Sequence, residues 1–518
     1  MTRYRDYSFL GTTQSLCPDC LAVVPAKVIS RSGRVYFRKT CATHGVRDDF
    51  VCRDVTWFDR TSYSLPGKIP ARFSTEPLRG CPYDCGLCSE HEQHTCIGLL
   101  EINSACNLEC PLCFAASGPS GNHLTFEECR TAIDHLVAAE GQPEILQLSG
   151  GEPTIHPQFE NIHRYACEQP IDIVMINTNG IRFARDRRFL EAIAERRHRT
   201  EIYLQFDSFE DSGYRSLRGA SLLETKLKAI EQLGEVGLNT ILVCTVQPRV
   251  NDHEIGRLVE FGIERPWITG VSFQPATYSG RFVMPEDLEH RITFPDIIKA
   301  VADQTTMWTE TDFSPLPCAH PNGHTLSYAY RSGNRVTPLA RFVNLEEHLD
   351  LLAGRITFNR ERARELISRY IARKACGGDN CGCDTSTGTP QPSAHSAIQQ
   401  NRFEQLGISL KADSFVRNSG IQKESEILQA LPSGLTKEQM NDAGQFFLKT
   451  ITQTISPRDM FRITTTSFMD AWNFDIRQLM KECVHFVLPS GHIIPFSAYN
   501  VLYRNGKVRL PELRQAPA

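Results

Sequence analysis

Short apolar segments alternate with amphipathic helical segments from residue 99 onward. The predicted strands are residues 98–102, 145–148, 173–176, 202–206, 240–246 and 271–273. In the helical segment 125–139, apolar residues recur at spacings of three and four, and Thr125 is expected to cap the helix with Glu128 as its partner. Strands that alternate with helices pair in parallel, so the pattern predicts six βα units between residues 99 and 315. Since eight units close a full barrel, six predict an α/β fold with a partial (β/α)6 barrel of the TIM type.

The pattern changes on both sides of this segment. Strand candidates at 22–24 and 34–37 predict a small β-rich module at the start of the chain. Helices at 360–375 and 437–450 and a hairpin around Ser490-Gly491 predict an α+β C-terminal region, in which residues 384–396 form a flexible loop. We therefore expect an N-terminal metal-binding module (1–75), an iron–sulfur connector rich in Gly and Cys (76–98), the partial barrel (99–315) and a C-terminal iron–sulfur region (316–518).

Composition excludes several classes of protein. Of the 518 residues, 41% are hydrophobic and 22% are charged, as in a soluble globular protein. The net charge of −4 provides no overall basic excess for binding nucleic acid. The sequence has no run of about 18 apolar residues to span a bilayer, and no apolar segment of the signal-peptide type follows Met1. We therefore expect a cytoplasmic protein without a nucleic-acid partner.

Cysteine is the outlier, because 19 are present and eleven of them precede residue 114. In a reducing compartment this crowding predicts metal binding or catalysis rather than disulfides. Two segments share the spacing Cys-x3-Cys-x2-Cys, which lets three thiolates of one loop bind one cubane iron–sulfur cluster. They are Cys81, Cys85 and Cys88, and Cys106, Cys110 and Cys113. Cys96 is expected to complete the first set as a fourth ligand, whereas the second set has no such neighbour and leaves one iron open.

Two further groups of potential ligands are present. Cys17, Cys20, Cys41 and His44 have the spacing of a four-ligand site for one zinc or one mononuclear iron, with Cys52 as a substitute ligand. A third cluster is expected at Cys318, Cys376, Cys381 and Cys383, where Cys483 could replace any member and a zinc knuckle or a redox loop is the alternative. The isolated Cys129, Cys167 and Cys244 are expected in the core.

The second cysteine set directly follows the first barrel strand, so it lies on the edge of the barrel where chemistry is expected. The next strand ends in Gly150-Gly151-Glu152-Pro153, where adjacent glycines let the backbone approach a ligand and a carboxylate can accept a bond from an ammonium group. The third strand ends in Asn177-Thr178-Asn179-Gly180, a polar loop on the same rim. Gln205, Asp207 and Gln274 either face the barrel interior or bond to backbone at the strand ends.

These motifs resemble those of the radical S-adenosylmethionine (SAM) superfamily, namely CNLECPLC (Cys106–Cys113) and GGEP (Gly150–Pro153) in that order. The resemblance implies a [4Fe–4S] cluster whose three protein ligands and catalytic residues are Cys106, Cys110 and Cys113. SAM would chelate the fourth iron, and reductive cleavage of SAM would yield a 5′-deoxyadenosyl radical. Residues expected to bind SAM are Gly150, Gly151, Glu152, Pro153, Asn177 and Asn179. Reduced ferredoxin or flavodoxin is the implied electron donor.

A finer resemblance covers most of the chain and is to the archaeal tetraether lipid synthase group, with its bacterial membrane-spanning lipid synthases. It is carried by CPDC (Cys17–Cys20), CATHG (Cys41–Gly45), SFQPATYSGR (Ser272–Arg281) and CVHFVLPSGHIIPFSAYN (Cys483–Asn500), among other segments. It implies carbon–carbon coupling between lipid alkyl chains, one or two auxiliary clusters, and a peripheral contact with the membrane through an amphipathic face.

Several other functions remain open. Some relatives are assigned as pterin methyltransferases, so the main alternative is methylation of a pterin or another small heterocycle. Modification of a peptide or a sugar is a third possibility, and a non-enzymatic electron carrier is the contrasting class. A buried apolar tunnel would favour a lipid substrate, whereas a short polar pocket would favour a heterocycle.

Overall fold

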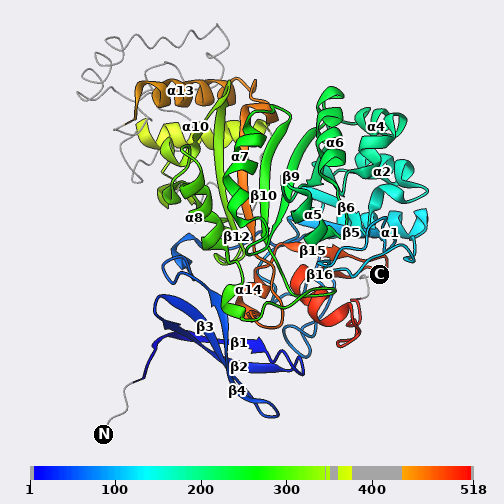
Figure 1. Cartoon of the computed structure of the whole chain (residues 1–518), viewed down its shortest axis with the longest axis vertical. Helices are drawn as coiled ribbons and strands as arrows, with labels where there is room; N and C mark the ends of the chain where they lie inside the picture. Colours follow the sequence, from blue (N-terminus) through cyan, green and yellow to red (C-terminus); the bar gives the residue numbers. More distant parts are fainter. Residues whose placement is uncertain (1–4, 345, 350–359, 376–434, 515–518) are drawn as a thin grey trace.

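The computed structural model describes residues 5–344, 346–349, 360–375 and 435–514 (Figure 1). The predicted loop 384–396 and the predicted ligands Cys376, Cys381 and Cys383 lie outside the described residues. Within the described ranges, no helix combines the length and the apolar character needed to cross a membrane.

The N-terminal module is an antiparallel sheet of four strands in sequence order. The strands are β1 (Ser8–Leu16), β2 (Val23–Arg31), β3 (Arg34–Cys41) and β4 (Gly45–Cys52). Its buried Lys39 forms an ion pair with Asp49 at 2.9 Å. The same ammonium group donates to the carbonyl oxygens of Ala471 and Trp472 at 2.9 and 2.8 Å. One buried cation therefore joins this module to the C-terminal part of the chain, below the barrel in Figure 1.

The six predicted barrel strands are all present and pair in parallel with their sequence neighbours. They are β5 (Ile97–Asn103), β6 (Ile145–Gly150), β7 (Ile173–Thr178), β8 (Thr200–Gln205), β9 (Asn239–Val246) and β10 (Ile268–Pro275). Two further strands extend this parallel run, because β14 (Met460–Thr466) pairs with β10 and β15 (Val484–Val487) pairs with β5. The sequence pattern did not predict β14, and it predicted β15 only as part of the hairpin around Ser490-Gly491, because both strands lie far from the βα series along the chain.

Antiparallel strands complete the sheet at its two ends. They are β11 (Ser314–Pro315), β12 (His324–Ser332) and β13 (Arg335–Pro338) beyond β14, and β16 (Ile493–Pro495) beyond β15. Among the described residues no strand pair joins these two ends, so the sheet is a partial barrel as predicted. The same sheet contains strands from both sides of residues 315 and 316, where the boundary between the barrel and the C-terminal region was predicted. Gly491, with φ of +89°, lies in the turn of the predicted hairpin between β15 and β16.

Helices cover the outside of the parallel strands (Figure 1). They are α1 (Phe126–Glu140), α2 (Phe159–Glu168), α3 (Ile181–Arg185), α4 (Arg187–Ala194), α5 (Asp211–Arg218), α6 (Leu223–Glu235), α7 (Ile255–Ile263) and α8 (Phe294–Gln304). The predicted cap of α1 is present, since the Thr125 hydroxyl accepts from the Glu128 backbone N–H and the Glu128 carboxylate accepts from the Thr125 N–H. Cys129, Cys167 and Cys244 are buried, as predicted.

The C-terminal region adds a second small core beside β12. There α10 (Arg360–Ala375) packs on α13 (Lys437–Ile451) through Tyr370, Phe446 and Phe447. Also present are α14 (Ile476–Met480), α15 (Phe496–Ala498) and a π-helical turn at Tyr499–Tyr503. Single 3-10 turns occur at Thr61–Tyr63, Pro153–Ile155, Asp252–Glu254, Leu288–His290, Glu310–Asp312, Leu339–Arg341, Glu346–His348 and Pro457–Asp459.

Candidate active site and metal centres

The loop after β5 carries Cys106, Cys110 and Cys113 and is fixed by backbone hydrogen bonds. The N–H of Cys106 donates to Gly118 O at 3.0 Å. Cys113 and Arg281 exchange two backbone bonds, of 2.8 and 2.9 Å. The Arg281 guanidinium also donates to Ser117 O at 2.9 Å. Three thiols are therefore presented by one ordered loop at the carboxyl end of the barrel strands.

The two glycines that end β6 also have a packing role, beside the expected role in SAM binding, which stays a prediction. A Cβ atom on Gly150 would lie 2.1 Å from Asn103 O, and one on Gly151 would lie 2.1 Å from Ala105 O. Their backbones bond the same segment, because the N–H of Gly151 donates to Asn103 O at 2.9 Å. The glycines thus let β6 pack directly on the backbone that leads into the cysteine loop, while both also line the cavity beside it. Pro153 does not line that cavity and begins a 3-10 turn.

Glu152 is almost fully buried, and its carboxylate is bonded within the protein. It accepts from the Thr154 N–H at 3.1 Å, the Thr178 hydroxyl at 2.8 Å and the Asn179 N–H at 2.7 Å. Burial raises the pKa of Glu152 despite these bonds. This carboxylate therefore fixes the end of β7 and the start of the following loop against the loop after β6. Asn177, in β7, and Asn179, just after it, both line the cavity.

A buried ion pair beside the cysteine loop was missed from the sequence. Arg218, the last residue of α5, donates to both carboxylate oxygens of Asp207 at 2.8 and 2.7 Å. Burial raises the pKa of the Cys110 thiol, and the positive charge of Arg218 opposes that rise. Lys226 is also buried and donates to Asn179 O at 2.6 Å; burial lowers its pKa to about 8. In the sequence, Arg218 lies in the segment SLRG (Ser216–Gly219), and the spacing between this segment and the cysteines does not predict that they meet.

The three thiols fit a polynuclear cluster. Burial raises the pKa of Cys106 to about 12, so its thiolate form needs a bound cation. Within the described residues, the sulfur atoms of Cys106, Cys110 and Cys113 do not all lie within 4.8 Å of one another. Three thiolates presented by one loop can each bind a different iron of a cubane cluster.

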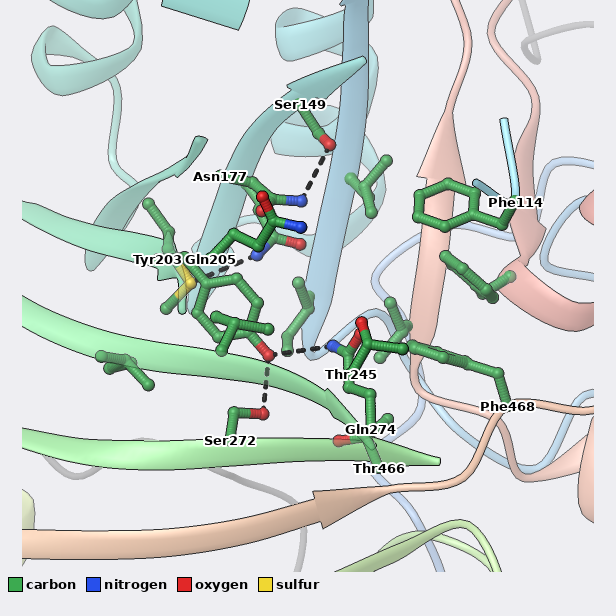
Figure 2. A pocket seen from close by; sticks show the side chains of 18 of the residues that line it. Phe114, Ser149, Asn177, Tyr203, Gln205, Thr245, Ser272, Gln274, Thr466 and Phe468 are labelled. Carbon is green, nitrogen blue, oxygen red and sulfur yellow. Dashed lines mark hydrogen bonds between the residues drawn. The ribbon is translucent and has the colours of Figure 1, made fainter. Parts of the chain in front are cut away.

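A cavity of about 290 Å³ extends from the cysteine loop into the barrel. Polar side chains form one wall, where the Tyr203 hydroxyl donates to Ser272 Oγ at 2.7 Å and accepts from the Gln274 amide at 3.2 Å. Figure 2 shows this group together with Gln205, and with Phe114 and Phe468 on the opposite side. Gln205 and Gln274 thus line the interior. The Asp207 carboxylate accepts from the Thr245 backbone N–H at 3.0 Å, which is the second of the two predicted alternatives, and also pairs with Arg218. The deeper wall is apolar and contains Ile97, Ile145, Met175 and Ile241.

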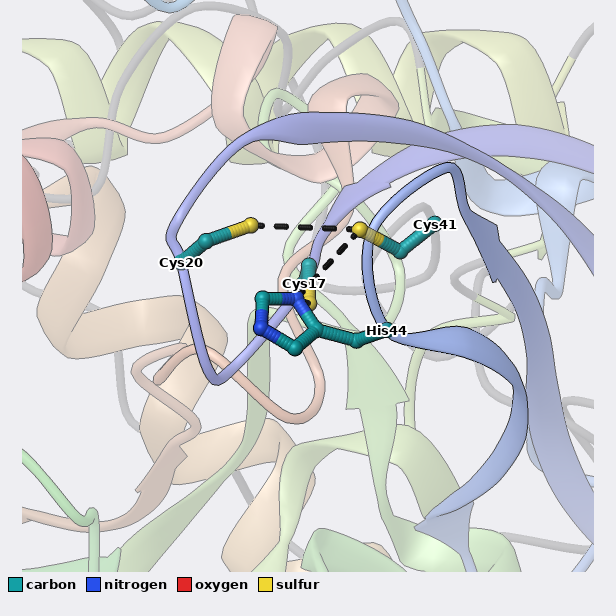
Figure 3. Close-up of side chains that lie close together, drawn as sticks. All are labelled: Cys17, Cys20, Cys41 and His44. Carbon is teal, nitrogen blue, oxygen red and sulfur yellow. Dashed lines mark hydrogen bonds between the residues drawn. The ribbon is translucent and has the colours of Figure 1, made fainter.

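The N-terminal ligand set is assembled as predicted. One donor atom from each of Cys17, Cys20, Cys41 and His44 lies within 4.8 Å of the others (Figure 3). His44 Nδ1 is 3.5 Å from Cys17 Sγ and 3.6 Å from Cys41 Sγ. Bonds from the His44 and Thr43 backbones lower the pKa of Cys41 to about 6. This set fits one zinc or one iron ion. The substitute ligand Cys52 is outside it, with its thiol 3.4 Å from Asp54 O.

The first Cys-x3-Cys-x2-Cys set does not have the expected fourth member. Cys81, Cys85 and Cys88 line one small cavity together with His91. The Cys96 thiol instead contacts the thiols of Cys318 and Cys483, as part of a separate buried group. The reason is the pairing of β5 with β15. The Cys96 backbone N–H donates to Cys483 O at 3.0 Å, directly before these paired strands, and this places Cys96 beside Cys483. Assigning Cys96 to the first set is therefore wrong in this structure.

The comparisons with known proteins agree with the barrel and with the N-terminal site. The family model of the radical SAM superfamily matches residues 100–262. The HMPTM N-terminal zinc ribbon domain matches residues 9–53. The first match includes the Cys106–Cys113 loop and Glu152, and the second includes Cys17, Cys20, Cys41 and His44, so the chain carries a radical SAM domain preceded by a zinc ribbon.

Similar proteins differ in how much of this chain they cover. The 7,8-dihydro-6-hydroxymethylpterin dimethyltransferase of Methanocaldococcus jannaschii is 29% identical over 521 residues, which cover 95% of this chain and 94% of that protein. A probable GTP 3′,8-cyclase of Methanosarcina mazei is 30% identical over 171 residues, 31% of this chain and 49% of that protein. The crystal structure of Streptococcus suis SuiB bound to S-adenosylmethionine aligns with a TM-score of 0.33 and 16% identity over 40% of this chain and 46% of that one.

The protein is therefore an enzyme of the radical SAM type, with a [4Fe–4S] cluster and SAM as its cofactors. The grouping with tetraether lipid synthases stays a prediction. The relative that aligns over almost the whole chain carries the name expected for the alternative, a pterin methyltransferase.

Proposed function

We propose that this radical SAM enzyme methylates a pterin or a similar small heterocycle. The observation that carries the proposal is the polar wall of the barrel cavity, where Tyr203, Ser272 and Gln274 are already hydrogen-bonded in a row. Such groups can pair with the ring nitrogens and carbonyl of a heterocycle and fix its orientation. The name of the M. jannaschii relative supports the same substrate class.

Different residues would hold the cluster, position the cofactor and line the substrate space. Cys106, Cys110 and Cys113 would hold three irons of the cluster, and Glu152 positions Asn179 through the bond to its backbone N–H. The bound cluster and SAM would supply the one-electron chemistry. Arg218 holds a positive charge beside the cluster ligands, and the amides of Asn177 and Gln205 line the space that leads to the polar wall. The aromatic rings of Phe114 and Phe468 help to exclude water from this space.

The proposal is tested by anaerobic turnover with reductant, SAM labelled in its methyl group, and 7,8-dihydro-6-hydroxymethylpterin. Labelled methyl groups in the pterin product are expected. Replacing Tyr203→Phe should lower methylated product by about tenfold, the effect of losing one oriented hydrogen-bond pair, while SAM cleavage persists. Tyr165→Phe is the matched control, because its hydroxyl bonds Asp134 on the outer surface. An equal loss of product in both variants, or a pterin that gains no methyl group, would exclude this function.

Coupling of lipid alkyl chains is the second candidate function. It is favoured by the deeper wall of the same cavity, where Ile97, Ile145, Met175 and Ile241 provide an apolar lining. The same labelled SAM distinguishes the two reactions in a membrane lipid extract. Coupling gives an unlabelled product that is lighter than its two precursor chains by two hydrogens, whereas methylation adds the label.

A further inference from the structure

Arg462 is a charged side chain on a part of the cavity wall that lies apart from the cysteine loop. Among the described residues that line this cavity, the acidic and basic side chains other than histidine are Glu152, Arg218 and Arg462. Glu152 bonds the loops beside the cysteines, and Arg218 is paired with Asp207. Arg462 belongs instead to β14, so it places a cation on the wall from a different element.

Strand register shows where this cation lies along the barrel. Arg462 pairs with Gly270 in β10 and with Tyr328 in β12. Thr466, at the carboxyl end of β14, also lines the cavity. Four residues at about 3.3 Å each separate Arg462 from Thr466 by about 13 Å along the strand. Because the cysteine loop follows the carboxyl end of the parallel strands, Arg462 marks the opposite end of the cavity.

The Arg462 guanidinium is held in place by its neighbours. A Cβ atom on Gly270 would lie 2.5 Å from Arg462 Cγ, so the glycine leaves the space that the arginine stem occupies. Arg462 Nη2 donates to Glu201 Oε2 at 2.7 Å, and Glu201 Oε1 accepts from the Thr269 hydroxyl at 2.8 Å. The exposed fractions of the Arg462 and Glu201 side chains are 23% and 13%. Since Glu201 does not line the cavity, it holds the guanidinium from behind.

The chemistry of this pair indicates which ligand group fits. A guanidinium has five N–H donors and no acceptor, so a ligand that reaches Arg462 must offer an acceptor atom. Glu201 already balances the charge, so a neutral carbonyl oxygen fits better than a phosphate, which would compete with Glu201 for the same cation. The end of an alkyl chain would remove water from the guanidinium without replacing its hydrogen bonds, and this costs binding free energy.

The polar wall of the cavity continues from Arg462 toward the cysteine loop. Burial raises the pKa of Tyr203, and the positive charge of Arg462 is among the influences that oppose this rise, which indicates that the guanidinium lies near the Tyr203 hydroxyl. From Tyr203 the row of hydrogen bonds continues to Ser272 and Gln274 (Figure 2). A flat ring that lies along this row would reach Arg462 with one edge.

We propose that Arg462 binds the substrate by donating to the ring carbonyl of the heterocycle, and that Glu201 is the residue that positions it. This inference rests on the proposed function, because a pterin has a carbonyl oxygen on its ring whereas an alkyl chain has no acceptor. It assigns the amino-terminal end of the cavity to substrate recognition and leaves the end beside the Cys106 loop to the cofactors.

The test compares two ligands of the reconstituted full-length enzyme by calorimetric titration with SAM present and no reductant. They are 7,8-dihydro-6-hydroxymethylpterin and its 4-amino analogue, in which an amino group replaces the ring carbonyl. The wild type should bind the carbonyl compound at least about tenfold more tightly, because the amino group would bring a donor against the Arg462 donors. In Arg462→Gln this preference should disappear, since an amide can bond either group. The KM for the pterin should rise about tenfold, while the KM for SAM stays at the wild-type value.

Arg331→Gln is the matched control. Arg331 is also buried and lies in the neighbouring strand β12. It donates to the backbone oxygens of Gly262 and Ile268 at 3.3 and 2.9 Å and does not line the cavity. This variant should lower the thermal stability and keep both the carbonyl preference and the KM for the pterin. Equal changes in the two variants, or a wild-type preference in Arg462→Gln, would overturn the assignment.

Two further measurements decide the matter if Arg462→Gln does not fold. Equal affinity of the wild type for the two ligands would remove the Arg462 contact and leave the pterin function standing, whereas binding of neither ligand would overturn that function and this inference with it. Glu201→Gln keeps the cation and removes its balancing charge, so inorganic phosphate should compete with the pterin in this variant. Equal competition by phosphate in the wild type would overturn the choice of a neutral carbonyl.

Discussion

The substitution Gly151→Ala should push the end of β6 away from the loop that carries Cys106. A Cβ atom there would lie 2.1 Å from Ala105 O and 2.5 Å from Ala105 C, both in the backbone. Because real Cβ atoms essentially never approach other heavy atoms closer than 3.0 Å, the two segments must separate by about 0.9 Å. The hydrogen bond from the Glu152 N–H to Ala105 O, 2.9 Å long, would be stretched by the same movement.

A shift of this size matters because the reacting groups must be held closely. A misplacement of about 1 Å can lower the rate of an oriented reaction by about 100-fold. We therefore expect Gly151→Ala to form 5′-deoxyadenosine about 100-fold more slowly than the wild type. The assay is chromatography of 5′-deoxyadenosine after anaerobic incubation with SAM and a chemical reductant, normalised to bound iron.

Gly118→Ala provides the matched control in the same loop. A Cβ atom on Gly118 would meet only the Glu109 carboxylate, at 4.0 Å, so this variant should keep the wild-type rate. If Gly151→Ala also retained the wild-type rate and iron content, the packing of β6 on the cysteine loop would have no part in the chemistry.

Three further predictions concern stability and the zinc ribbon. Burial lowers the pKa of His163 to about 4, so the folded state favours the neutral imidazole. As the pH falls from 6.5 to 4, the unfolded state binds a proton at this residue first, and the free energy of unfolding should fall by about 3 kcal/mol. Urea titrations at several pH values should show a smaller loss in His163→Gln, and an identical pH dependence would contradict the assignment. Arg218→Met leaves the buried Asp207 carboxylate without its cation and should reduce the free energy of unfolding by about 3–5 kcal/mol. The double variant Arg218→Met with Asp207→Leu should recover much of this loss. If the single and the double variant lose the same free energy of unfolding, the ion pair is not responsible. His44→Ala should remove one metal ion per chain by elemental analysis while Cys52→Ala keeps it, and the reverse result would mean that Cys52 is the ligand.

The sequence was sufficient for the features that depend on neighbouring residues. The Cys106–Cys113 loop, the zinc ribbon and the capped helix α1 each follow from a spacing within a short segment, so local geometry decides them. The six βα units also follow from the sequence, because the alternation of apolar strands and amphipathic helices fixes the parallel pairing.

Features that join distant segments required the tertiary structure. Strands β14 and β15 lie about 190 and 390 residues from their partners β10 and β5, and no periodicity indicates such a pairing. The ion pair of Arg218 with Asp207 depends on how α5 returns to the barrel rim. For the same reason, a regular cysteine spacing assigned Cys96 to the wrong neighbours: which thiols meet is decided by the strand ladder between β5 and β15, and that ladder places Cys96 next to Cys483.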